Sequence, residues 1–291
     1  MKYGEALRLL RRDKKISAEH LGGDRLTKSF IGKFERGVSQ IEFTNLLYIL
    51  NRMDVGVEEF LSIANDHEIY WDFPKWTSTV NEAIIKSDFT KLGELAAEQL
   101  ALYTQDKLKP NLVNAYVLQA VIADLQNEEA ASETVDYVLN ALFENSIWTK
   151  YEIFILSLIS KFLKPESIKL FGDELTREAL NAKLDTTDQQ NMARAILNLV
   201  RALIENQELS LAQDFLQLVD QLLAKKRMFY VETHALFVKG MLEIAKGHVV
   251  NGNQMTSDAI FIFRRLGEPT IADVRQEYLD DFKKRVIYDT F

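Results

Sequence analysis

The feature that most constrains the fold is the spacing of apolar residues in the long C-terminal part of the chain. From Thr79 onward, apolar residues recur every 3 to 4 positions, in segments of about 12 to 20 residues with breaks at Pro110, Pro165 and Pro269. This period is that of an α-helix with one buried side, and no segment shows the alternation that is typical of a strand. The sequence therefore predicts an all-α protein.

The predicted helices of this part pack as antiparallel pairs, because their connections are short. Each pair alone would leave an apolar side uncovered, so that successive pairs stack into a tetratricopeptide-like α-solenoid. No clean 34-residue period is present, and the repeat consensus is matched only loosely. The helices are expected near residues 79–87, 90–104, 112–126, 131–143, 149–162, 166–183, 188–205, 209–224, 229–247, 249–266 and 271–288.

The N-terminal part differs from the rest in its charge. Residues 1–52 contain eleven Lys and Arg against six Asp and Glu, whereas the remaining chain contains 24 against 37. Only the first segment suits a polyanion such as DNA, and the acidic remainder should stand away from phosphates. Helical periodicity is interrupted after the predicted helix 57–64 and around Pro74. We expect a first domain at 1–66, a linker at 67–78 and a second domain at 79–291.

Residues 3–61 have the pattern of a five-helix helix-turn-helix unit, with further helices at 42–52 and 57–64. Gly22 and Gly23 supply a tight turn, after which Thr27 is placed to cap the third helix. Ile31 and Phe34 of this helix are spaced to enter the core. The opposite side, with Lys28, Ser29 and Lys33, then faces outward, where the first residues of such a helix reach base edges in the major groove.

Phe30 allows two interpretations. An exposed aromatic ring at this position would meet a thymine methyl group, which is a known mode of base recognition. Packing of the ring on the second helix is the alternative, and it is slightly favoured.

The head resembles the Cro/repressor-type (XRE) helix-turn-helix family. Leu7-Arg8-Leu9-Leu10-Arg11 matches the family's first-helix pattern, and Ser29 to Gly37 matches its recognition helix with the Glu-Arg-Gly ending. This resemblance implies that Arg11 pairs with Glu35 inside the unit. It also implies that Arg8, Arg12 and Arg36 contact phosphate. The candidate DNA-binding residues are Arg8, Arg12, Thr27, Lys28, Ser29, Phe30, Lys33 and Arg36.

The predicted helix 188–205 contains a polar band beside its apolar side. Asn191 and Asn198 are seven residues apart, as are Arg194 and Arg201, so that each pair lies two turns apart on nearly the same side of the helix. Asn offers a donor and an acceptor to a peptide backbone, and Arg binds a carboxylate with two hydrogen bonds. A groove for an extended peptide and an ordinary solvated helix side are both compatible with this pattern. Tyr151, Tyr230 and His234 are weaker candidates for the same groove, since aromatic residues at helical spacing are more often core.

Several classes of function are disfavoured by the sequence. The absence of cysteine excludes disulfides, zinc–thiolate sites and thiol chemistry. No phosphate-binding glycine loop, zinc-protease motif or nucleophile elbow is present, so we expect no enzyme activity, no cofactor and no metal site. No apolar run approaches the roughly 20 residues that span a bilayer. We expect a cytoplasmic protein without a membrane partner.

The combination of head and repeats resembles the Rgg/GadR/MutR family of regulators. The specific matches are Leu26-Thr27-Lys28-Ser29 and Lys33-Phe34-Glu35-Arg36-Gly37, and the rest agrees in length and helical pattern. The resemblance implies a homodimer that binds double-stranded promoter DNA and takes up a short signalling peptide on the concave side of its repeats, which also favours the groove. An orphan repressor and a DNA-tethered protein-interaction module are the alternatives. Whether a ligand moves the heads or recruits RNA polymerase stays open.

Overall fold

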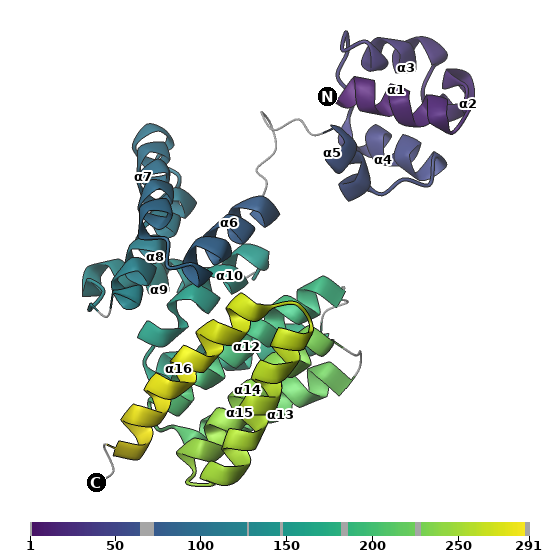
Figure 1. The fold of residues 1–291 in the computed structure, drawn as a ribbon. Coiled ribbons are helices and arrows are strands. Elements are labelled where there is room, and N and C mark those ends of the chain that lie inside the picture. Colours follow the sequence, from purple (N-terminus) through teal and green to yellow (C-terminus); the bar gives the residue numbers. More distant parts are fainter. Residues whose placement is uncertain are drawn as a thin grey trace. The chain divides into compact units, whose positions relative to one another are not determined.

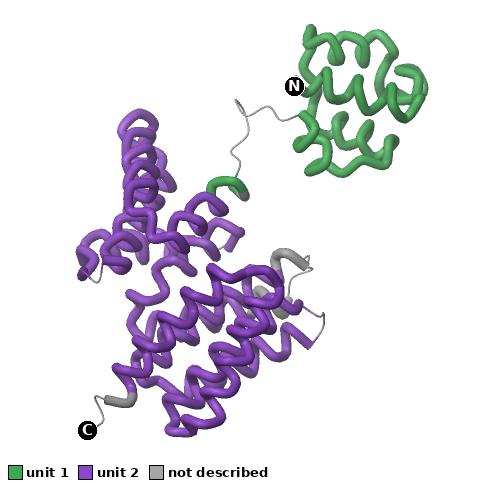
Figure 2. Tube along the Cα trace, in the orientation of Figure 1, with its two compact units in different colours: residues 1–76 green, residues 77–291 purple. Residues whose placement is uncertain are grey.

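The computed structural model describes residues 2–64, 73–126, 128–145, 148–181, 186–224 and 228–288. Contacts within the chain divide it into two compact units, residues 1–76 and 77–291 (Figure 2). All regular elements of the described residues are helices, which confirms the predicted all-α class. None of the described helices is both long enough and apolar enough to cross a membrane.

The first unit contains the five expected helices of the head (Figure 1). Each of them contributes a fully buried side chain to one common core, which includes Leu7, Leu21, Ile31, Ile49 and Phe60. Burial of such side chains is what holds short helices together, since helices of this length are marginal on their own. The helices are α1 (Tyr3–Asp13), α2 (Ala18–Gly22), α3 (Lys28–Glu35), α4 (Phe43–Arg52) and α5 (Val57–Ala64).

The remaining helices follow the predicted pattern closely. The main difference is α6, which begins at Phe73 and not near residue 79. The sequence predicts a break around Pro74, but Pro74 is the second residue of this helix, where a missing N–H costs no hydrogen bond. The helices are α6 (Phe73–Ile85), α7 (Phe89–Asp106), α8 (Lys109–Leu125), α9 (Ser132–Phe143), α10 (Lys150–Ile159), the 3-10 turn η1 (Ser160–Phe162), α11 (Pro165–Asn181), α12 (Thr186–Glu205), α13 (Leu209–Ala224), α14 (Phe229–Ala245), α15 (Val249–Arg265) and α16 (Pro269–Tyr288).

The predicted linker at 67–78 stays a proposal. Its residues 67–72, with Tyr70 and Trp71, lie outside the described residues. Phe73 and Trp76 belong to α6, and their rings stack with centroids 6.4 Å apart.

The second unit is a stack of helix pairs in two layers (Figure 1). The pair α14/α15 has the most extensive contacts, followed by α7/α8 and then α12/α13. In the first layer α12 lies between α10 and α14, and α16 packs against α14 and α15. The predicted α-solenoid is therefore confirmed, with α10, α12, α14 and α16 on one side.

Small residues allow α14 and α15 to pack unusually closely. A Cβ atom added at Gly240 would lie 2.6 Å from Cγ2 of Thr256 and 2.9 Å from the carbonyl oxygen of Gly252. A Cβ at Gly252 would lie 2.5 Å from the carbonyl oxygen of Gly240. Only glycine fits on both sides of this crossing, and it fixes the position of the α14 side chains discussed below.

Candidate DNA-binding and ligand-binding sites

The third helix begins where the sequence predicts. The hydroxyl of Thr27 accepts a hydrogen bond from the backbone N–H of Phe30 at 3.1 Å, which caps α3. Ile31 and Phe34 are buried in the core of the head. This leaves one side of α3 directed away from the core.

The exposed side of the head gathers most of the candidate DNA-binding residues. Lys28, Ser29 and Lys33 are exposed on α3, and Arg36 is exposed directly after it. Phe30 is half-buried, which agrees with neither a fully exposed base-reading ring nor a ring fully packed on the second helix. The candidates on α1, Arg8 and Arg12, are exposed as well.

The ion pair between Arg11 and Glu35, implied by the family resemblance, is present. Nε of Arg11 donates to Oε1 of Glu35 at 2.5 Å, and Nη2 donates to Oε2 at 2.9 Å. The remaining Nη1 donates to the carbonyl oxygen of Ile16 at 2.9 Å. Both side chains are largely buried, so that the pair joins the end of α3 to α1 from inside the head.

A second contact near α3 was not expected from the sequence. The guanidinium carbons of Arg25 and Arg52 lie 4.8 and 5.5 Å from the ring centroid of Tyr48. Nη2 of Arg52 also donates to the carbonyl oxygen of His20 at 2.7 Å. A Cβ atom at Gly23 would lie 2.4 Å from the hydroxyl of Tyr48. Cation–π contacts and close packing therefore hold the turn before α3 against α4.

In the second unit, the polar residues of α12 have different surroundings. Arg194 is exposed, whereas Asn191, Asn198 and Arg201 are half-buried. The amide of Asn198 donates to Oγ of Ser157 in α10 at 2.6 Å. At least one donor of Asn198 is therefore engaged in joining α12 to α10.

Both arginines of α12 lie over aromatic rings of the neighbouring helices. The guanidinium of Arg194 is 5.9 Å from the ring centroid of Tyr230 in α14, and that of Arg201 is 5.1 Å from the ring of Tyr278 in α16. Tyr230 in turn meets His234 edge to face, with centroids 4.8 Å apart. Three helices thus bring these side chains together.

Arg275 of α16 completes this group, although no feature of the sequence analysis singled it out. Its Nη2 lies 3.5 Å from Nδ1 of His234, and its guanidinium lies 5.5 Å from the ring of Phe237. Arg275 lies on the same side of α16 as the buried Ala272, Leu279 and Phe282. A cation on an apolar side of a helix is rare, and this pattern in the sequence indicates a functional role for Arg275. The basic–aromatic cluster is defined here as Arg194, Arg201, Tyr230, His234, Arg275 and Tyr278.

Glu205, the last residue of α12, is the carboxylate that contacts this cluster. It accepts hydrogen bonds from the hydroxyl of Tyr278 and, at 3.4 Å, from Nη2 of Arg285. Burial raises the pKa of Tyr278 above its ordinary range, so that the phenol keeps the proton that it donates.

Burial and like charge determine the protonation of the two central groups. Burial, with Arg275, Arg194 and Arg201 nearby, lowers the pKa of His234 to about 2. Burial and Arg201 lower the pKa of Arg275 to about 10. At neutral pH the imidazole is therefore neutral and Arg275 is charged. Because a guanidinium only donates, Nδ1 of His234 acts as the acceptor and Nε2 carries the hydrogen.

Tyr151, the remaining candidate, lies at the start of α10. Its hydroxyl donates to the carbonyl oxygen of Pro110 in α8 at 3.2 Å. Six residues separate it from Ser157, the contact of Asn198, which is about 9 Å along the helix.

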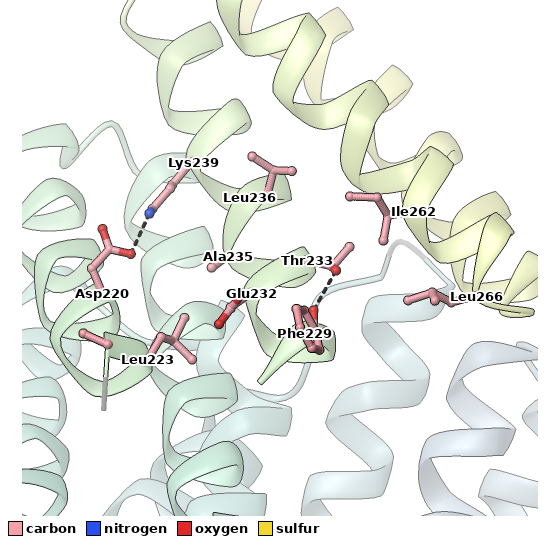
Figure 3. A pocket seen from close by; sticks show the side chains of 11 residues that line it. Asp220, Leu223, Phe229, Glu232, Thr233, Ala235, Leu236, Lys239, Ile262 and Leu266 are labelled. Carbon is pink, nitrogen blue, oxygen red and sulfur yellow. Dashed lines mark hydrogen bonds and ion pairs between the residues drawn. The ribbon is translucent and has the colours of Figure 1, made fainter. Parts of the chain in front are cut away.

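A hollow of about 810 Å³ lies between α13, α14 and α15 (Figure 3), and neither Tyr230 nor His234 lines it. Its apolar wall includes Phe229 and Leu266, which are 70% and 60% exposed. Lys239 forms an ion pair with Asp220 at 2.6 Å on its rim. No site residue was predicted here, because its wall comes from three separate helices.

Comparison with known proteins agrees with this architecture. The crystal structure of the SHP pheromone receptor Rgg2 of Streptococcus dysgalactiae superposes with a TM-score of 0.77 at 24% identity, covering 98% of this chain and 100% of that chain. A protein of Listeria monocytogenes gives 0.81 at 20% identity, with 97% of both chains covered. The complex of PrgX with cCF10 gives 0.75 at 16% identity, covering 97% of this chain and 92% of that chain.

These structures share the fold, and a family model gives the relationship. Residues 95–277 match the model for the C-terminal domain of the HTH-type transcriptional regulator Rgg. The match spans more than half of the chain and includes α12, α14 and the first part of α16, up to residue 277. The chain therefore belongs to the Rgg family of HTH-type transcriptional regulators.

Proposed function

We propose that the head binds double-stranded promoter DNA through the exposed side of α3. Lys28, Ser29 and Lys33 are the base-reading residues, because they lie on the first turns of a capped helix and point away from the core. Thr27 and Phe30 border this side. The exposed Arg8, Arg12 and Arg36 contact phosphates, which position the head without reading sequence.

The same proposal includes a short peptide as the controlling ligand. The observation that carries it is the basic–aromatic cluster, in which guanidinium, phenol and imidazole groups from three helices converge at exposed and half-buried positions. These groups suit a peptide, since they offer donors to carbonyl or carboxylate oxygens beside apolar ring surfaces. Rgg2 is described as a SHP pheromone receptor, and PrgX was crystallised with cCF10, which supports this ligand class.

Within the proposed site, the residues have different roles. Arg194 and Arg201 are the charged contacts, with Tyr230 and His234 between them. Asn191, whose amide has no hydrogen bond within the described part of the chain, contacts the peptide backbone, and Asn198 also holds α12 to α10. Tyr151 extends the site toward α8.

The proposal also includes a homodimer in the cytoplasm. Helix-turn-helix regulators bind two half-sites about one helical turn apart, roughly 34 Å, and two heads are needed to reach both. Recruitment of RNA polymerase by the peptide-bound dimer and movement of the heads are separate mechanisms that the test below does not require.

The test is calorimetric titration of the full protein with short apolar peptides encoded beside its gene, together with promoter binding with and without each peptide. We expect saturable binding of a peptide. Arg201→Ala should weaken this binding at least tenfold, because the variant loses one charge-assisted hydrogen bond to the peptide. Arg265→Ala is the matched control, because Arg265 also stacks on an aromatic ring, Phe261, but at the exposed end of α15. Both variants should keep full promoter affinity.

A second candidate function is a protein-interaction module tethered to DNA. The apolar hollow between α13 and α15 favours it, because exposed apolar side chains such as Phe229 and Leu266 are typical of interaction surfaces (Figure 3). Silence from every peptide, with promoter binding intact, would support this function or an orphan repressor.

A further inference from the structure

The basic–aromatic cluster contains more positive charge than its own residues neutralise. Arg194, Arg201 and Arg275 are three cations. They are also the charged groups that lower the pKa of His234. Glu205 is the carboxylate at the edge of the cluster, and Tyr278 already donates to it. A second cation, Arg285, shares Glu205 from its outer side. Among the described residues, the cluster thus contains more cations than carboxylates.

Arg275 differs from the other two arginines because one of its donors is buried. Its Nε is buried and has no hydrogen-bond partner among the described residues. Its one polar contact there, at 3.5 Å, is with the neutral ring of His234, which brings no opposite charge. A buried donor without a partner is costly, and an ionised acceptor would relieve that cost.

Arg275 is surrounded by aromatic side chains, which offer apolar surface next to its charge. Tyr230, His234 and Phe263 form a ring group, with centroid distances of 4.6 to 5.8 Å. Arg194 and Arg201 lie about 10 Å apart along α12, which is the length of about three residues of extended peptide. One end of such a segment lies at Arg194, and the other at Arg201 and Arg275.

We propose that the peptide ligand is anionic and that one carboxylate binds between Arg201 and Arg275, beside Tyr278. This inference rests on the proposed function, since it names the chemical class of the peptide. The carboxylate accepts from both guanidinium groups, and the adjoining apolar residues cover the exposed ring of Tyr230. The same chemistry is offered by an Asp or Glu side chain and by a C-terminal carboxylate.

The test uses four synthetic heptapeptide mixtures and the full-length protein. All positions are randomised among Leu, Ile, Val, Phe and Trp, except for one Asp or one Asn, and each mixture ends in a free carboxylate or in an amide. Peptides that stay with the protein on a sizing column are identified by mass spectrometry, and their affinities are measured individually. We expect the Asn-amide mixture to bind about tenfold to hundredfold more weakly than at least one acidic mixture. The comparison of Asp-amide with Asn-carboxylate identifies which carboxylate is used.

Variants connect this preference to the residues. Arg275→Met should abolish the difference between acidic and neutral peptides, and Arg201→Met should reduce it, whereas the exposed Arg265→Met should keep it. Circular dichroism confirms that each variant is folded. The inference would be overturned if acidic and neutral peptides bound equally well. It would also be overturned if the two folded site variants kept the full preference for acidic peptides. Neither result would contradict the proposed function as a peptide receptor. Retention of no peptide from any mixture would overturn the proposed function itself and the inference with it.

Discussion

The ion pair inside the head gives the sharpest prediction about stability. Replacing Glu35 by Leu leaves the Arg11 guanidinium in a place where its side chain is only 14% exposed. Two charge-assisted hydrogen bonds, at 2.5 and 2.9 Å, are lost together. Removing one partner of a buried pair costs about 3–5 kcal/mol.

The expected loss lies at the lower end of that range, about 3 kcal/mol, because Arg11 keeps its bond to the carbonyl oxygen of Ile16 and reaches some water. A domain of this size has only about 3–10 kcal/mol in total. Glu35→Leu should therefore bring the head close to unfolding while the second unit remains stable. Promoter affinity should fall even though Glu35 itself is buried and does not face DNA.

Hydrogen exchange with mass spectrometry of the full protein measures this directly, because fragments from residues 2–64 report on the head separately from those of the second unit. The exposed Glu59→Leu is the control, for which we expect a change below about 1 kcal/mol. Arg11→Met combined with Glu35→Leu should recover most of the loss, since no unpaired charge remains. A double variant as unstable as Glu35→Leu would refute the reasoning, and so would a single variant that exchanges like the natural head.

Three further predictions concern the DNA-binding side, the helix crossing and the neutral imidazole. Lys33→Ala should weaken binding to the cognate operator selectively, whereas Arg36→Ala should weaken binding to all duplexes and lower the salt slope by about one unit in anisotropy titrations; reversed outcomes would contradict the assignments. Gly240→Ala should lower the free energy of unfolding by about 1–3 kcal/mol, because the new Cβ meets Thr256; an unchanged urea midpoint would mean that the crossing separates freely. Because the pKa of His234 is lowered to about 2, its ring takes up a proton below pH 6.5 only in the unfolded chain. Stability should thus fall by up to about 1.4 kcal/mol per pH unit below that point, and His234→Gln should remove this part of the slope in urea titrations at pH 5 and 7; equal slopes would show that the ring is accessible to protons.

Local patterns were sufficient for most of the fold. Apolar period and capping are properties of neighbouring residues, so the helices of both units and the Thr27 cap follow from the sequence. The exception, the start of α6 at Phe73, arises because a proline ends a helix when it is internal but fits one in the first turn.

The candidate sites were less predictable, because their partners come from distant parts of the chain. The pattern of α12 makes Asn198 a candidate peptide contact, but it does not indicate that the Asn198 amide also donates to Ser157, 41 residues earlier on another helix. Arg275 was overlooked for the same reason, as its neighbour His234 is also 41 residues away. Periodicity tells which side of a helix is buried, but it does not tell what that side meets.

The long separation of Glu205 from its partners also has a consequence for synthesis. Tyr278 and Arg285 follow Glu205 by 73 and 80 residues, so the cluster cannot close until the last helix has been made. At synthesis rates of about 5–20 residues per second, α12 waits roughly 4 to 15 s for Tyr278. The head, whose core lies wholly within the first 64 residues, is ready to fold well before that. A newly made chain therefore gains its DNA reader first and completes the surface proposed to control it last.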